Sequence, residues 1–165
     1  MPQTIDSNLL DALLDSWDRN NTILTNLLQA LPPGALDLRP MTDSPSIGQL
    51  ITHIHYCRLI FVQEDAPEFA LPLTDQEWRT ERDPARLIQL LDESSRIVRA
   101  AFTGRFQQGR HMDQHYDHPI LLLQHMLWHE GYHHGQIKLT LKLAGKPFDD
   151  EVIGPLTWDV WMDKH

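Results

Sequence analysis

The residues of this chain that could do chemistry, by type and by spacing, are histidines. His125, His129 and His133 stand four residues apart. On an α-helix successive residues advance by about 100°, so these three would lie on one ridge, each a turn above the last. Two imidazoles placed in this way can bind one metal ion, because their ring nitrogens reach a common point beside the helix. The spacing therefore predicts a metal site that takes two ligands from this ridge.

A third ligand must come from another element, and His53 is the candidate. Its neighbours Leu50, Ile51 and Ile54 predict a second helix whose apolar face turns towards the core. Helical bundles assemble metal sites from side chains on facing helices. Three neutral imidazoles leave coordination positions open, which is typical of a catalytic site, and they suit zinc, nickel, copper or iron(II). The alternative is an exposed histidine pair and a hydrogen-bonded core histidine, without a metal.

The segment from His129 to His133 also matches H-E-x-x-H, the pattern of zinc metalloproteases in which the glutamate is the general base. That residue is Glu130 in this chain, so a zinc hydrolase is a second hypothesis. The pattern is short, however, and no strand is predicted that would line a substrate cleft. On a helix Glu130 lies about 100° from His129, and we expect its carboxylate to face solvent.

Two residues close to His53 also call for an interpretation. Cys57, the single cysteine, follows His53 by four residues and would lie on nearly the same helix face. It could be a ligand or a reactive thiol, but a small apolar filler of the core is the favoured interpretation. His55 would point away from the ion bound by His53, and we expect it on the polar surface.

The elements that must position these residues are four long helices, predicted from apolar residues at three- and four-residue steps. Their expected ranges are Leu9 to Leu31, Ser44–Pro45 or Ser46 to the residue before Pro67, Asp83–Pro84 to Gly104, and His118–Pro119 to Gly145. Two shorter pieces are a capped helical turn at Thr74–Glu77 and one short helix within Phe148–His165 that covers the bundle. With no strand pattern, the fold class is all-α, a four-helix bundle that forms a single domain over residues 1–165.

The charge of the chain argues against one class of partner. The formal net charge is −9, and the arginines are interleaved with acidic residues. Nucleic-acid binding depends on lysines and arginines that neutralise phosphates, so no nucleic-acid partner is expected. We also expect no secretory signal and no membrane span, because no apolar stretch is long enough. The expected location is the cytoplasm.

Two motifs resemble those of the DinB/YfiT-like family of metal-dependent enzymes. The first is Ser46-Ile47-Gly48-Gln49-Leu50-Ile51-Thr52-His53, which resembles the second-helix motif of that family. The second runs from His125 to Ile137 and resembles the last-helix motif, which usually ends in H-x-x-x-H-R-G-Q. One departure is His134, which stands where the family pattern has arginine. His125 stands where some members also have histidine, either as an additional ligand or, as we favour, as a partner of a ligand.

The resemblance carries several expectations. It implies a bundle with up-up-down-down connectivity and a nickel or zinc ion held by His53, His129 and His133. It also implies a thiol-dependent S-transferase or isomerase that uses a low-molecular-weight thiol such as bacillithiol or mycothiol. An open metal position can bind such a thiol, lower its pKa and hold the thiolate as a nucleophile. The remaining alternative is a metal-binding bundle without turnover. A homodimer formed through exposed helix faces is also expected.

Overall fold

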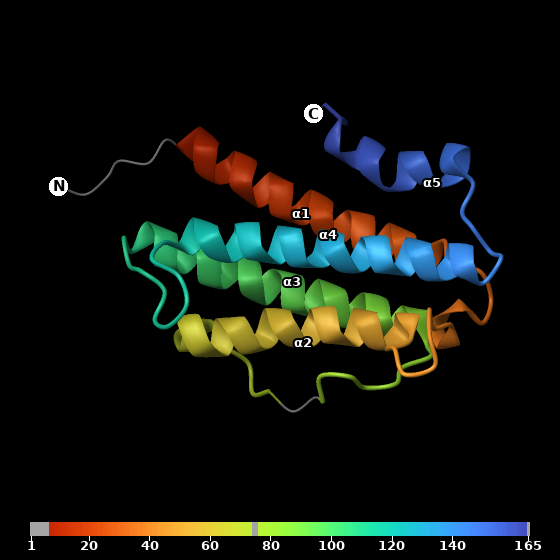
Figure 1. The fold of residues 1–165 in the computed structure, drawn as a ribbon. Helices are drawn as coiled ribbons and strands as arrows, with labels where there is room; N and C mark the ends of the chain where they lie inside the picture. The colour runs from red at the N-terminus through yellow and green to blue at the C-terminus, as the bar shows by residue number, and fades with distance from the viewer. Residues whose placement is uncertain (1–6, 74–75, 165) are drawn as a thin grey trace.

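Helices make up the fold in the computed structural model, which describes residues 7–73 and 76–164. The long helices are α1 (Ser7–Gln29), α2 (Ile47–Asp65), α3 (Pro84–Gln107) and α4 (Pro119–Leu143), followed by the short α5 (Asp150–Leu156) (Figure 1). Single 3-10 turns lie at Ala35–Asp37, Pro67–Phe69 and Trp158–Trp161. The described residues contain no strand, which confirms the all-α prediction. None of their helices is both long and apolar enough to cross a bilayer.

Helices α3 and α4 begin where the sequence predicts, and α2 begins at the later of its two predicted positions. Ser46 caps α2 in a reciprocal capping box, in which its side chain accepts from the backbone of Gln49 while the Gln49 side chain accepts from the backbone of Ser46. Asp83 and His118 cap α3 and α4, and each is followed by a proline at the first helical position. After α4 the chain turns at Gly145, whose φ of 70° lies in the left-handed region that favours glycine.

The predicted end of α3 at Gly104 is wrong, because the helix continues for three more residues to Gln107. Gly104 meets a different requirement. A Cβ at this position would lie only 2.0 Å from Cζ of Phe69, so the glycine makes room for an aromatic ring. The chain leaves the helix at Gly109, where φ is 61°.

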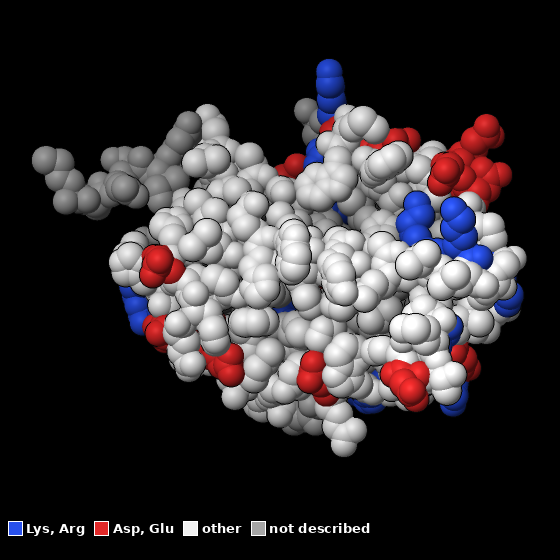
Figure 2. Space-filling view, in the orientation of Figure 1, with Lys and Arg blue, Asp and Glu red and all other residues white. Residues whose placement is uncertain are grey.

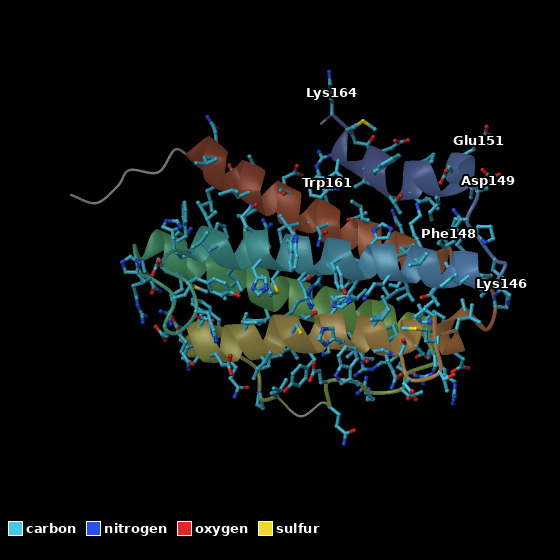
Figure 3. The ribbon with its side chains drawn as sticks, in the orientation of Figure 1. Lys146, Phe148, Asp149, Glu151, Trp161 and Lys164 are labelled. Carbon is cyan, nitrogen blue, oxygen red and sulfur yellow. The ribbon has the colours of Figure 1, made fainter. Side chains whose placement is uncertain are left out.

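The C-terminal tail lies against α1. Asp149 caps α5 by accepting from the backbone N–H of Glu151 at 2.9 Å (Figure 3). The side chain of Asn26 donates to the carbonyl of Leu156 at 2.8 Å, and that of Arg19 donates to the carbonyl of Val160. The predicted covering helix is therefore α5 followed by a 3-10 turn. The predicted capped turn at Thr74–Glu77 includes residues 74–75, which lie outside the described residues.

The directions of the long helices differ from the expected up-up-down-down order. Helix α1 runs antiparallel to α3, because Trp17 donates to the carbonyl of Ser95 whereas the earlier Leu14 accepts from the later Arg99. Helix α2 runs parallel to α3, since His55 pairs with the carbonyl of Leu90 and the later Arg58 with that of Leu91. Helices α2 and α3 thus share one direction, opposite to that of α1, as Figure 1 also shows.

The physical reason is the connection between α2 and α3, residues 66–83, which we call the crossing connection. Its Phe69 packs on Gly104, near the end of α3, whereas Asp83 caps the start of α3. The intervening chain must therefore travel the length of a 24-residue helix, about 36 Å. Fourteen extended residues can span about 45 Å, so the connection is long enough to return α3 to the end of the bundle where α2 began.

The core is divided along the bundle into two apolar clusters. One includes Leu27, Ile51 and Ile137, and the other includes Trp17, Phe102 and Met126. Buried polar and charged side chains lie on the same helices between these two groups. They include His53, Arg58, Ser94, Glu130 and His133. The candidate site therefore occupies the middle of the bundle.

Candidate metal centre

Three histidine rings from two helices meet in the middle of the bundle. The Nε2 atom of His129 lies 3.1 Å from Nε2 of His53 and 3.0 Å from Nε2 of His133. One ring nitrogen of each residue lies within 4.8 Å of those of the other two, an arrangement that could hold a metal ion. The structure thus brings together the three residues selected from the sequence.

The spacing of the nitrogens fits a metal ion. Metal–nitrogen bonds of about 2.0–2.1 Å, separated by angles of about 90–109°, place two ligand nitrogens about 2.8–3.4 Å apart. The separations of 3.1 Å between His53 and His129 and of 3.0 Å between His129 and His133 fall inside that range. Without an ion, three ring nitrogens directed at one point would stabilise one another little, because one proton can form a hydrogen bond between only two of them.

The second ring nitrogen of two of these histidines has a partner of its own. Nδ1 of His53 lies 3.0 Å from a carboxylate oxygen of Glu77, and Nδ1 of His133 lies 2.7 Å from Oε1 of Gln136. Metal-binding histidines usually donate this second N–H to a carboxylate or carbonyl, which fixes the tautomer and aims the other nitrogen at the ion. Nδ1 of His129 is buried without a partner among the described residues.

The crossing connection forms one wall of the site. The Trp78 ring stacks on His53, with ring centroids 4.0 Å apart and planes 4° apart. Backbone carbonyls hold the connection in place: that of Trp78 accepts from the Gln49 side chain at 3.0 Å, and that of Arg79 accepts from the Thr52 hydroxyl at 2.8 Å.

These contacts explain most of the motif Ser46–His53. Gln49 caps its own helix and anchors the connection, Thr52 anchors it a turn later, and His53 points into the site. A Cβ at Gly48 would lie 2.6 Å from the carbonyl oxygen of Glu81, so glycine permits this close approach.

Burial keeps the three imidazoles neutral. Burial, followed by repulsion from His133 and His53, lowers the pKa of His129 to about 3. Burial is also the main cause that lowers the pKa of His53 and of His133, opposed in part by Glu77 and Gln136 respectively. Neutral imidazole is the form that donates a lone pair to a metal.

Glu130 does not face solvent as we expected. It is fully buried, and its two carboxylate oxygens accept from Arg58 at 2.6 and 2.7 Å. The side chain of Asn20 donates to the same carboxylate. Arg58 is itself fully buried, and its guanidinium also donates to the carbonyl of Leu91 and lies over the Trp17 ring. The expectation was wrong because Arg58 on α2 supplies the charge partner that allows the Glu130 carboxylate to be buried.

Cys57 and His125 adjoin the cluster without belonging to it. The Sγ atom of Cys57 is 3.6 Å from both ring nitrogens of His53, and burial raises the pKa of the thiol to about 12. Nδ1 of His125 pairs with the hydroxyl of Tyr116 at 2.7 Å. Burial raises the pKa of Tyr116, so the phenol keeps its proton and donates it.

Two further histidines, His55 and His134, have different surroundings. His55 is buried, contrary to our expectation, and pairs with the carbonyl of Leu90 at 2.8 Å. Helix α2 packs against both α3 and α4, so its opposite faces are both covered. Nε2 of His134 is buried without a partner among the described residues, and burial lowers the pKa of this histidine to about 4.

Sequence reasoning missed Glu77, Trp78 and Arg58. Glu77 and Trp78 lie in a segment without helical periodicity, and nothing in their spacing relates them to His53. Arg58 did leave a signal: it is a lone charge in the run Cys57–Val62, and a buried charge requires a partner.

The fold and the site together define an all-helical protein with a three-histidine cluster that could hold a metal ion. The chain belongs to the DinB family, whose family model matches residues 1–150. This confirms the resemblance carried by the two histidine motifs. No curated protein and no solved structure matches the chain.

Proposed function

We propose that the protein is a metal-dependent enzyme whose divalent ion is held by His53, His129 and His133. The observation that carries the proposal is the convergence of three neutral imidazole nitrogens at separations of 3.0 and 3.1 Å. Among the described residues the group of candidate ligands contains these three side chains, which would leave coordination positions open for water or substrate. Nickel or zinc is the proposed ion.

We propose thiol-dependent S-transfer or isomerisation as the reaction class. A bound ion would supply Lewis acidity, which lowers the pKa of a coordinated low-molecular-weight thiol. The chain supplies orientation: Glu77 fixes the His53 ring and Gln136 fixes the His133 ring. The Glu77 side chain is 43% exposed, so its carboxylate lies at the solvent edge, where it can accept a proton released by an incoming thiol.

The first test is elemental analysis of the purified protein. The wild type should contain one ion per chain, and the double variant His53→Ala/His129→Ala should contain almost none. His111→Ala is the control, because this histidine is exposed and lies outside the cluster. Equal metal content in the wild type and the double variant would refute the proposed ligand set.

The second test separates an enzyme from a bundle that only binds metal. A panel of low-molecular-weight thiols with a chlorodinitroarene should give turnover that requires both the thiol and the metal. An inert bundle would retain its ion and show no rate above the uncatalysed reaction with any thiol.

Hydrolysis with Glu130 as general base is disfavoured by the contacts of that residue. Both carboxylate oxygens are occupied by Arg58, so the guanidinium would have to leave before Glu130 could accept a proton from water. Hydrolysis of ester or peptide substrates that survives Glu130→Gln would exclude the general-base role.

Three further expectations about the whole protein remain proposals. They are a single domain over residues 1–165, a cytoplasmic location and a homodimer. The first can be tested by whether the chain unfolds in one cooperative transition, and the second by fractionation of the cells that make it.

A further inference from the structure

A second cavity of the molecule lies between α4 and the C-terminal tail, with a volume of about 320 Å³. Ligand pockets typically occupy about 300–1,000 Å³, so it has room for a small molecule. Its α4 residues lie about 100–200° around the helix from His133, which separates it from the candidate metal centre by the helix itself. The tail cavity is lined by Gly131, His134, Gly135 and Lys138 of α4 and by Ile153 and Trp158 of the tail.

Two glycines of α4 form one wall of the tail cavity. Gly131 and Gly135 are four residues apart and exposed, and a Cβ at either position would meet nothing within 4 Å. No packing contact among the described residues therefore requires glycine here, although glycine is a poor helix former. What the two glycines do provide is a bare stretch of helix backbone that a flat molecule can approach closely.

An aromatic ring forms a second wall. Cδ1 and Nε1 of Trp158 would lie 4.0 and 3.6 Å from a Cβ at Gly154, so the indole rests against α5. The Trp158 residue is nevertheless 72% exposed, whereas its neighbour in the wall, Ile153, is 1% exposed. The tail cavity thus has an apolar base and an exposed indole on which another ring can stack.

Positive charge is concentrated at this end of the molecule. The chain has a formal net charge of −9, yet all its lysines follow residue 137. Figure 2 shows basic side chains over the last turns of α4, beside acidic side chains at the start of α5. Lys138 lines the tail cavity, and among the described residues no carboxylate forms an ion pair with it. Its ammonium group is therefore available to an anion.

His134 supplies a second polar group in the same wall, one turn before Lys138. Its Nε2 atom is buried without a partner among the described residues. A buried ring nitrogen without a hydrogen bond destabilises the protein, and such a group calls for a partner. A molecule in the tail cavity offers one, which the imidazole reaches by turning about its Cβ–Cγ bond.

We propose that the tail cavity binds a small aromatic carboxylate. The aromatic ring lies between the glycine wall and Trp158, and the carboxylate accepts hydrogen bonds from Lys138 and from the ring N–H of His134. Asp150 also lines the cavity, and its carboxylate repels a second negative charge, which favours a monoanion over a phosphate ester. The binding does not depend on the proposed enzymatic function, because the two sites lie on different sides of α4.

Isothermal titration calorimetry on the full chain tests the proposal with 2-naphthoate and its uncharged analogue 2-naphthamide. The wild type should bind one naphthoate with a dissociation constant below about 1 mM, and naphthamide about fivefold more weakly, because it lacks the charge-assisted hydrogen bond. Lys138→Met should reduce the affinity for naphthoate to that for naphthamide. Trp158→Ala should weaken both ligands, and Gly135→Leu, which fills the cavity, should abolish both.

Two matched controls lie outside the tail cavity. Trp128 is 71% exposed on α4, close to the 72% of Trp158, and does not line the cavity. Lys146 is an exposed lysine that does not line it either. Trp128→Ala and Lys146→Met should both bind naphthoate like the wild type. Circular dichroism verifies folding, and Gly135→Leu replaces Trp158→Ala if that variant unfolds.

A further control separates the tail cavity from the candidate metal centre, where a carboxylate could bind to an ion. The double variant His53→Ala/His129→Ala, or chelator-treated wild type if that variant unfolds, should bind naphthoate undiminished. Loss of binding there would place the ligand on the ion and overturn the proposal. So would a wild type that does not bind naphthoate, equal affinities for the two ligands, or a control variant that loses as much affinity as Lys138→Met.

Discussion

The His53 ring is held by two side chains that come from the same short piece of chain. Trp78 stacks on its face and Glu77 binds its Nδ1. A carboxylate in this position makes the imidazole a better donor to a metal and holds the ring in one orientation, and loss of such partners typically weakens metal affinity 10–100-fold.

We predict that Glu77→Gln lowers the affinity for the ion about tenfold and that Glu77→Ala lowers it further. Glutamine can still accept from Nδ1–H but carries no charge. Competition with a chromophoric chelator measures the effect. Glu64→Gln, at a position of similar exposure on α2, should change nothing, and equal affinities for all four proteins would exclude the role of Glu77.

A second prediction at the residue scale concerns Cys57. Its thiol is buried beside His53 and has a pKa raised to about 12, so it should not be a nucleophile at neutral pH. The group of candidate ligands among the described residues does not include it, so we also expect that it is not a ligand. Cys57→Ala should retain the full metal content of the wild type. In the folded protein, alkylation of Cys57 by iodoacetamide at pH 8 should be much slower than in urea. Loss of the ion from Cys57→Ala would contradict this.

At the scale of the elements, a buried ion pair joins α2 to α4. Arg58 and Glu130 are both fully buried, and removal of one member of such a pair leaves an uncompensated charge that costs about 3–5 kcal/mol. We predict that Arg58→Met lowers the free energy of unfolding by about this amount, measured in urea on metal-free protein. The double variant Arg58→Met/Glu130→Leu should recover part of the loss, and additive losses would show that the two charges are not coupled.

Two glycines in long helices should respond in opposite directions. A Cβ at Gly104 would meet the Phe69 ring at 2.0 Å, whereas a Cβ at Gly131 would have nothing within 4 Å. Gly104→Ala should therefore destabilise the protein by about 1–3 kcal/mol through overpacking. Gly131→Ala should stabilise it by up to about 1 kcal/mol through helix propensity. Thermal unfolding compares them, and shifts of the same sign would refute the explanation.

The sequence predicted those features that depend on local chemistry. Apolar periodicity and caps such as Ser46 and Asp83 located the four helices, and two histidine motifs selected the residues that converge. Features that depend on long-range packing were missed. In the sequence Gly104 resembles the glycine that ends a helix. Only the position of the Phe69 ring shows that this glycine lies within α3 and leaves space for that ring. The direction of α3 depends on a connection whose path has no periodic signature.

For the molecule as a whole, the buried histidines predict how stability depends on pH. The pKa of His129 is lowered to about 3 and that of His134 to about 4, whereas in the unfolded chain both should titrate near 6.5. The unfolded state therefore binds more protons below pH 6.5, so the free energy of unfolding should fall as the pH decreases from 6.5 to 5. Carboxylates contribute little in this window, because they titrate lower.

Urea unfolding of metal-free protein at pH 7.5, 6.5 and 5 measures this dependence. His134→Gln should reduce the slope by at most about 1.4 kcal/mol per pH unit, and it leaves the three candidate ligands in place. A slope that the variant does not change would show that His134 titrates normally in the folded protein.

The way in which the crossing connection is anchored has a consequence for how sites of this kind can diversify. Gln49 and Thr52 hold it through the main-chain oxygens of Trp78 and Arg79, atoms that every amino acid possesses. Side chains at these positions can therefore be exchanged without loss of the anchorage or of the helix packing. A designer who wished to change which molecules this protein accepts could vary residues 78 and 79 and leave the rest of the bundle as it is.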